Sequence, residues 1–76
     1  MFYVYVLKNT ISGKPYYGYT ADLKRRVREH GRYWKLVYYE AYTSKADALL
    51  RERKLKDYGQ ARSWLKLRIA HSYRGV

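Results

Sequence analysis

The stretch FYVYVLKNTISGKPYYGYT (residues 2–20) decides the fold of this chain. Residues 2–7 and 15–19 are rich in Tyr and Val, which favour β-strands, and the Ser12-Gly13 pair between them is typical of a turn. Pro15 has no amide donor and so suits the start of a strand. The stretch therefore predicts an antiparallel hairpin.

Side chains alternate between the two faces of a strand. One face of the hairpin must pack on helices, and the other can stay exposed to solvent. Tyr16 shares its face with Gly18, whose missing side chain leaves room for a backbone or a ligand. Tyr17 points the other way and is expected in the core.

Helix signals follow the hairpin. Thr20 and Ser44 are predicted N-caps, and Gly31 and Gly59 are predicted helix stops. Together they predict ββαβαα order, an α+β fold with a small three-stranded antiparallel sheet flanked by helices. The predicted strands cover residues 2–7, 15–19 and 34–42, and the predicted helices cover residues 21–30, 45–58 and 61–72.

Composition limits the classes of function. The chain has 76 residues, no cysteine and two histidines, which excludes disulfides and a structural zinc cluster. A formal net charge of +11 predicts binding to a polyanion, with nucleic acid the first candidate and an anionic membrane surface the second. No apolar run approaches the roughly 20 residues of a membrane span. We expect one cytoplasmic domain with no membrane association, monomeric rather than oligomeric.

Polar residues interrupt the apolar stripes of the first two predicted helices. Arg26 and His30 share a face with Leu23 and Val27. Arg26 either lays its stem along the sheet with its head in water or holds a phosphate. His30 suits a capping or surface position.

Glu52 lies on a stripe with Ala48, Leu49 and Leu55, where a carboxylate is costly unless it is paired or binds a metal. Its partner is therefore a cation such as Arg26 or Lys56, or a metal ion. The other five carboxylates are expected to be exposed. In the last helix, Trp64 is expected in the core.

These residues resemble the GIY-YIG nuclease domain. The half-motifs read YVY (residues 3–5) and YYG (residues 16–18), with ten residues between Tyr5 and Tyr16. Arg26, His30 and, within DALLRERKLK, Glu52 match later family positions. Tyr3 replaces the first glycine of the pattern, and Tyr17 replaces its second isoleucine. The resemblance is strongest over residues 2–58 and is closest to small free-standing members.

The resemblance implies a divalent-metal-dependent endonuclease that hydrolyses phosphodiester bonds of DNA, with a place in repair or recombination. Glu52 would bind Mg²⁺ or Mn²⁺, Tyr5 would act as general base, and Tyr16 would orient water or phosphate. Arg26 would neutralise developing charge, with His30 as an auxiliary. The expected substrate-binding residues are Gly18, Lys24, Arg25, Arg28 and Lys56, and further phosphate contacts are expected from Arg62, Lys66 and Arg68. The alternative is a non-catalytic nucleic-acid-binding module on the same fold.

Overall fold

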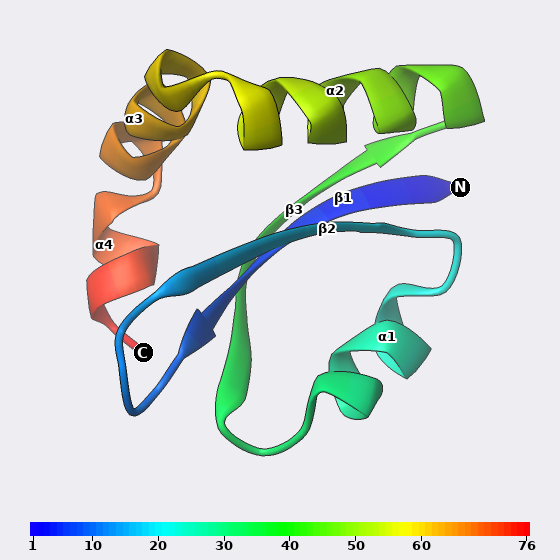
Figure 1. The fold of residues 1–76 in the computed structure, drawn as a ribbon. Coiled ribbons are helices and arrows are strands. Elements are labelled where there is room, and N and C mark those ends of the chain that lie inside the picture. The colour runs from blue at the N-terminus through cyan, green and yellow to red at the C-terminus, as the bar shows by residue number, and fades with distance from the viewer.

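The computed structural model describes residues 1–76 and confirms the α+β class (Figure 1). Three antiparallel strands form the sheet and four helices flank it, because the last predicted helix is broken at Ile69. The elements are β1 (Phe2–Asn9), β2 (Pro15–Thr20), α1 (Leu23–His30), β3 (Trp34–Tyr42), α2 (Lys45–Asp57), α3 (Gly59–Arg68) and α4 (Ala70–Arg74).

The strand order is β2-β1-β3, so β1 is central and paired on both edges. Tyr5 lies opposite Gly18 on one side and Tyr39 on the other. An irregularity between Val6 and Leu7 shifts the register with β3. Burial matches this central position, because no residue from Val4 to Leu7 is more than 1% exposed.

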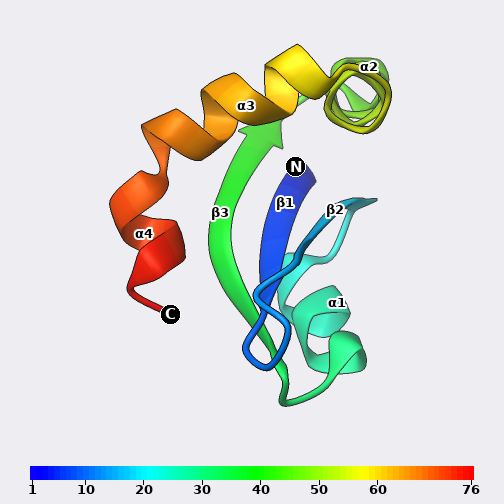
Figure 2. The ribbon, with the colours of Figure 1, turned by 60° about the vertical axis from the view of Figure 1, so that its left-hand side comes forward.

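The main core lies between one face of the sheet and helices α2, α3 and α4, which arch over it (Figure 2). Tyr17 faces this core, as predicted. The predicted alternation therefore holds along the hairpin, since Tyr5 and Tyr16 are left on the opposite face. The core residues are Val4, Val6, Tyr17, Ala48, Leu55, Leu65 and Ile69.

Helix α1 packs on the other side of the sheet, against β3. Its predicted N-cap, Thr20, is wrong. The Thr20 hydroxyl accepts from the Asp22 amide at 3.0 Å and donates to the Asp22 carbonyl at 3.1 Å, which forms a turn before the helix. Asp22 then caps the helix by accepting from the Arg25 amide at 3.2 Å. Gly31 ends α1 as predicted, with a φ of 92° that favours glycine.

The junction between α2 and α3 differs from the prediction. Helix α2 ends before Gly59, but Gly59 begins α3 instead of a loop. The Arg62 guanidinium donates to the carbonyls of Leu55 at 2.7 Å and Lys56 at 2.6 Å. Arg62 therefore caps α2 through its Nη1 atom, and its expected contact with phosphate stays a prediction.

Two further features concern the C-terminal helices. Trp64 is 65% exposed, so its predicted core position is wrong; Leu65 is the α3 residue that turns inward. Lys8 donates to the Tyr73 carbonyl at 2.8 Å, which ties α4 to β1. No helix has the length and apolar character needed to cross a membrane.

Candidate active site

Tyr5 is the centre of the candidate site. Its side chain is 1% exposed, although it lies on the sheet face opposite the main core. Its hydroxyl lies 3.2 Å from Nε2 of His30, within hydrogen-bond distance. Which atom donates depends on the tautomer of His30. The pair joins the central strand to the C-terminal end of α1.

Aromatic rings surround this pair. The Tyr16 ring lies 4.8 Å from the His30 ring and 6.2 Å from the Tyr5 ring, measured between centroids. Trp34, at the start of β3, lies 6.1 Å from both Tyr16 and His30. Trp34 therefore completes a wall of aromatic rings around the pair. Tyr16 is 39% exposed, so the wall opens to solvent there.

Gly18 lies directly beneath the Tyr5 ring. A Cβ at this position would lie 2.5 Å from both Cζ and Oη of Tyr5 and 2.9 Å from Cε1 of Tyr16. The prediction that Gly18 makes room for a phosphate is therefore wrong, because the phenol of Tyr5 fills that space. The absent side chain instead fixes where the Tyr5 hydroxyl lies.

Arg26 approaches from α1. Its Nε lies 3.4 Å from a carboxylate oxygen of Glu29, and about half of its side chain is exposed. Glu29 also accepts from Arg25 at 3.1 Å. Arg26 is thus held on the helix surface by a shared, solvated carboxylate, from which an anionic ligand can detach it at small cost.

Glu52 approaches from α2. Its side chain is 22% exposed and its carboxylate lies 3.4 Å from Nζ of Lys56, one of the two cations that the sequence offered as partners. The Lys56 amine lies 5.9 Å from the centre of the Tyr16 ring, so this pair reaches the aromatic wall. Leu49 is 41% exposed, and its predicted place on the buried stripe of α2 is wrong.

The charges of these groups influence the ionisation of Tyr5. Burial raises the pKa of Tyr5 to about 12, and the nearby Tyr16 adds to the rise. Arg26 lowers this pKa, whereas Glu52 and Glu29 raise it. The phenol therefore feels charges from both α1 and α2. It stays protonated at neutral pH and can act there as a donor.

The donor set can be tested against the metal that the resemblance implies. Glu52 is a single carboxylate beside Lys56, and no cluster of three or more His, Asp or Glu side chains that could hold a metal ion is present. One carboxylate suits a hard cation such as Mg²⁺ or Mn²⁺, which completes its shell with water and phosphate oxygens. It does not suit structural zinc, which needs four protein ligands. The residues present fit the expected ion.

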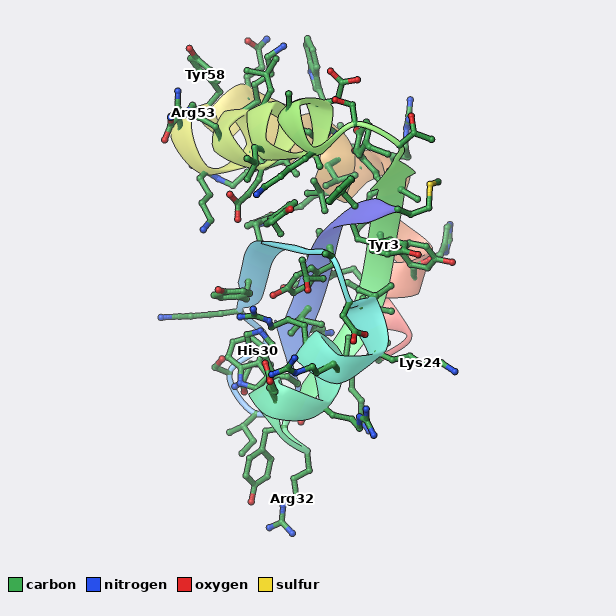
Figure 3. All side chains as sticks on the ribbon, turned by 90° about the vertical axis from the view of Figure 1, so that its right-hand side faces the viewer. Tyr3, Lys24, His30, Arg32, Arg53 and Tyr58 are labelled. Carbon is green, nitrogen blue, oxygen red and sulfur yellow. The ribbon has the colours of Figure 1, made fainter.

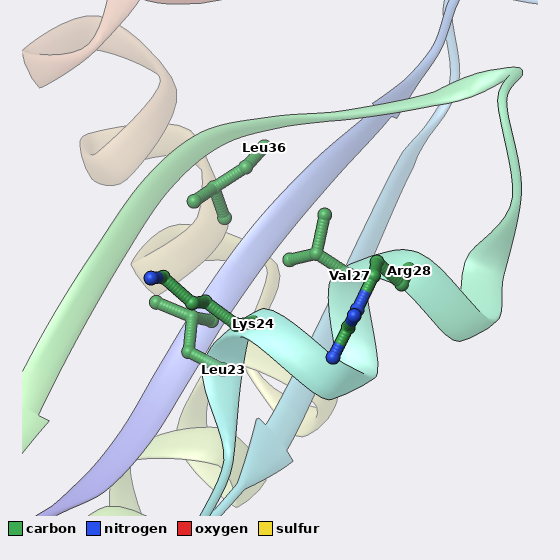
Figure 4. Close-up of a pocket in the computed structure, with 5 residues that line it drawn as sticks. All are labelled: Leu23, Lys24, Val27, Arg28 and Leu36. Atoms are coloured by element: carbon green, nitrogen blue, oxygen red, sulfur yellow. The ribbon is translucent and has the colours of Figure 1, made fainter.

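The remaining predicted contacts from α1 lie elsewhere. Figure 3 shows Lys24 and His30 at opposite ends of α1, with Lys24 directed away from the site. Lys24 and Arg28 border a pocket of about 360 Å³ whose apolar floor is Leu23, Val27 and Leu36 (Figure 4). These cations flank the site and do not line it.

Sequence reasoning missed one polar cluster on the core side of the sheet. Glu40 was expected to be exposed, but its side chain is 16% exposed and accepts from Arg51 at 3.0–3.2 Å and from Tyr38 at 2.7 Å. Tyr42 also donates to it. Burial acts to raise the pKa of Glu40, but these hydrogen bonds outweigh it and the pKa is lowered. The alternation of Tyr38, Glu40 and Tyr42 on one strand face was the available signal.

Comparisons with known proteins agree with this geometry. The model of the family described as "GIY-YIG catalytic domain" matches residues 1–64. UPF0213 proteins of Staphylococcus aureus strains Mu3, Mu50 and N315 are each 37% identical over 78 residues, covering 88% of this chain and 90% of the relative. No solved structure shows a significant match.

Proposed function

This chain belongs to the GIY-YIG catalytic domain family, which implies a nuclease-type function, and we propose that it is a divalent-metal-dependent endonuclease acting on DNA. The proposal rests on one observation above all. The buried Tyr5 hydroxyl lies 3.2 Å from His30 of α1, and the Glu52–Lys56 pair of α2 reaches the adjoining Tyr16 ring, so residues far apart in the sequence surround one hydroxyl. A binding surface alone has no use for a carboxylate facing a polyanion.

Glu52 is the proposed ligand of Mg²⁺ or Mn²⁺. Such an ion, when bound, polarises the scissile phosphate and stabilises the leaving oxygen. Lys56 already sits 3.4 Å from Glu52, and its ammonium is free to turn toward a phosphate oxygen once the carboxylate has another partner. Arg26 leaves Glu29 and neutralises charge on the non-bridging oxygens.

Tyr5 and His30 form the proposed proton path. A pKa of about 12 leaves almost no phenolate at neutral pH, so Tyr5 is a poor general base by itself. His30 resolves this difficulty, because its Nε2 lies 3.2 Å from the hydroxyl. As the water oxygen attacks phosphorus, the water proton passes to the Tyr5 oxygen and the Tyr5 proton passes to His30. The P–O bond to the leaving oxygen breaks, and solvent protonates that oxygen.

Tyr16 and the flanking cations hold the substrate in this proposal. The Tyr16 hydroxyl comes from a partly exposed ring and orients the water or the phosphate. Arg25, Lys24 and Arg28 line the solvent side of α1 and contact more distant phosphates, which positions the backbone without reading sequence. We place the protein, as a single domain and a monomer, in the cytoplasm, where repair or recombination supplies its DNA.

Replacement of Glu52 by Gln tests the proposal. We expect the Glu52→Gln rate of cleavage to fall about a hundredfold or more, because several kcal/mol of transition-state stabilisation are lost. Labelled single-stranded and duplex DNA would be incubated with Mg²⁺ or Mn²⁺ and, in parallel, with EDTA. Asp57→Asn is the matched control, since it removes an exposed charge from the same helix.

The outcomes separate catalysis from binding alone. Metal-dependent cleavage that is lost in Glu52→Gln and kept in Asp57→Asn, with DNA affinity unchanged or higher, supports the nuclease. If Glu52→Gln cuts as fast as wild type, Glu52 serves only as the partner of Lys56. If DNA binds but no variant cuts under any condition, the non-catalytic binding module is the better description.

A further inference from the structure

A second cationic and aromatic surface lies on the other side of α2 from the candidate active site. The α2–α3 groove has a volume of about 440 Å³ and is lined by Arg51, Lys54, Ala61, Trp64, Leu65 and Arg68. A neighbouring hollow of about 540 Å³ shares Lys54, Ala61 and Trp64 and adds Tyr58. Lys54 lies two residues after Glu52 on α2 and so points to the opposite side of that helix. Figure 3 shows Tyr58 on the outer side of α2, away from His30.

Two aromatic rings are highly exposed on this surface, that of Trp64 in the groove and that of Tyr58 in the neighbouring hollow. Trp64 is 65% exposed and Tyr58 is 61% exposed. Neither ring belongs to the hydrophobic core, because Leu65 and Ala61 are the α3 residues that face it. The structure therefore gives Trp64 no packing role. An exposed large apolar side chain without one is a feature of binding surfaces.

The charges in the groove are positive and partly unpaired. Arg51 is held by Glu40 through two nitrogens, so it is mainly structural. Lys54 and Arg68 form no ion pair. Asp57 is the one acidic residue that lines the neighbouring hollow. Two cations that form no ion pair thus line the same groove as an exposed indole.

We propose that the α2–α3 groove binds a single-stranded stretch of nucleic acid, with a base stacked on Trp64 and its phosphates on Lys54 and Arg68. The inference extends the proposed function, because the bound strand is then the single-stranded flank of the substrate cut near Tyr5. Exposed aromatics between cations are the arrangement that binds unpaired bases with little sequence preference. A closed duplex hides its base faces, and an acidic peptide or an anionic membrane offers no planar ring for stacking.

The test measures binding without cleavage. Fluorescence anisotropy of labelled oligo-dT, oligo-rU and a blunt hairpin duplex would be recorded in EDTA. The test variants are Trp64→Ala and the double variant Lys54→Ala/Arg68→Ala. Their controls are Tyr33→Ala, which removes another exposed aromatic ring, and Lys14→Ala/Lys45→Ala, which removes two other exposed charges.

We expect Trp64→Ala to weaken binding of the single strands about tenfold, as loss of one stacked base implies. Its affinity for the blunt duplex should change less than about twofold, which corresponds to well under 1 kcal/mol. The double variant should also bind single strands more weakly than its charge-matched control. Because both targeted side chains and the Trp64 ring are on the surface, far-ultraviolet circular dichroism should match wild type.

Three results would overturn the proposal. Unchanged oligonucleotide affinity in Trp64→Ala removes the stacking role. An equal loss for duplex and single strands makes the groove a general DNA-backbone contact. Equal competition from poly-glutamate shows a surface that recognises charge alone. The readout needs no catalysis, so a complete absence of metal-dependent cleavage in wild type would reject the nuclease assignment and leave this groove standing.

Discussion

At the scale of single residues, the geometry of the candidate site depends on Gly18, which has no side chain. Gly18 lets the Tyr5 ring lie against the β2 backbone, and the ring position determines the 3.2 Å contact between Tyr5 and His30. We predict that Gly18→Ala pushes the phenol away from His30. The rate of DNA cleavage should fall about a hundredfold, as displacements near 1 Å at reacting groups do. The free energy of unfolding should fall by about 1–3 kcal/mol, because the new methyl group overpacks the face.

Gly59→Ala is the control for this substitution. A Cβ at Gly59 meets only the end of the Arg62 side chain, at 3.6 Å, which is ordinary contact. Its cleavage rate should equal that of wild type. Cleavage assays and denaturant unfolding of both variants check the prediction. Undiminished cleavage in Gly18→Ala would show that Gly18 does not determine the position of the Tyr5 ring.

At the scale of elements, local patterns predicted the structure well wherever the deciding contacts are local. The hairpin, its two faces and the inward Tyr17 follow from alternation and turn chemistry. The errors at Thr20 and Gly59 lie at helix ends, where one side chain or distant guanidinium decides the boundary.

The sequence predicted only part of the candidate site, because some of the contacts that form it join elements far apart in the chain. Its tyrosines and the spacing between them can be read from the chain, but the contact between Tyr5 and His30 depends on how α1 docks on the sheet. The Glu40–Arg51 pair joins β3 to α2, so the alternation of Tyr38, Glu40 and Tyr42 along β3 did not by itself identify Arg51 as the partner. Trp64 fits an apolar stripe in sequence, yet Leu65 is the α3 residue that is buried in the core.

Arg62 offers a test of how α2 ends. Its guanidinium donates to two carbonyls at the end of α2, and the two helices meet there. We predict that Arg62→Ala lowers the free energy of unfolding by about 1.5–3 kcal/mol, since hydrogen bonds from a charged donor are lost. Lys66→Ala, which removes an exposed cation from the same helix, should change it by less than about 0.5 kcal/mol.

Denaturant unfolding of the two α3 variants measures this difference directly. Affinity for oligonucleotides should respond similarly to both, because each loses one positive charge. If Arg62→Ala unfolds like Lys66→Ala but binds DNA much more weakly, Arg62 contacts phosphate after all and its capping role is secondary.

At the scale of the whole molecule, tyrosines contribute to the stability of a fold whose hydrophobic core is small. The chain has eleven tyrosines, five of which have a raised pKa, and in three of these five the pKa reaches about 12. Burial raises the pKa of Tyr5 to about 12, and burial together with the hydrogen bond to Glu40 raises the pKa values of Tyr38 and Tyr42 to about 12. These tyrosines lie on both faces of the sheet, so their ionisation affects the whole fold.

The sign of the resulting pH dependence follows from linkage. In the unfolded chain these phenols lose their protons near pH 10, so below that pH their contribution to stability is complete. Between about pH 10 and about pH 12 the folded state holds more protons than the unfolded state. Each of the three tyrosines therefore subtracts up to about 1.4 kcal/mol of unfolding free energy per pH unit in this interval.

We predict a steep loss of stability across that interval, measured by denaturant unfolding at successive pH values. Lysines also lose charge there and relieve repulsion in a molecule of net charge +11, which acts in the opposite direction. Tyr5→Phe separates the two effects, because it keeps every lysine and removes one titrating phenol. Its stability should fall less steeply than that of wild type by up to about 1.4 kcal/mol per pH unit. If the unfolding free energies of the two proteins fall equally steeply with pH, Tyr5 ionises as readily in the folded state as in the unfolded state. Tyr5 would then not need His30 as a proton acceptor, and the argument for the proposed proton path would fail.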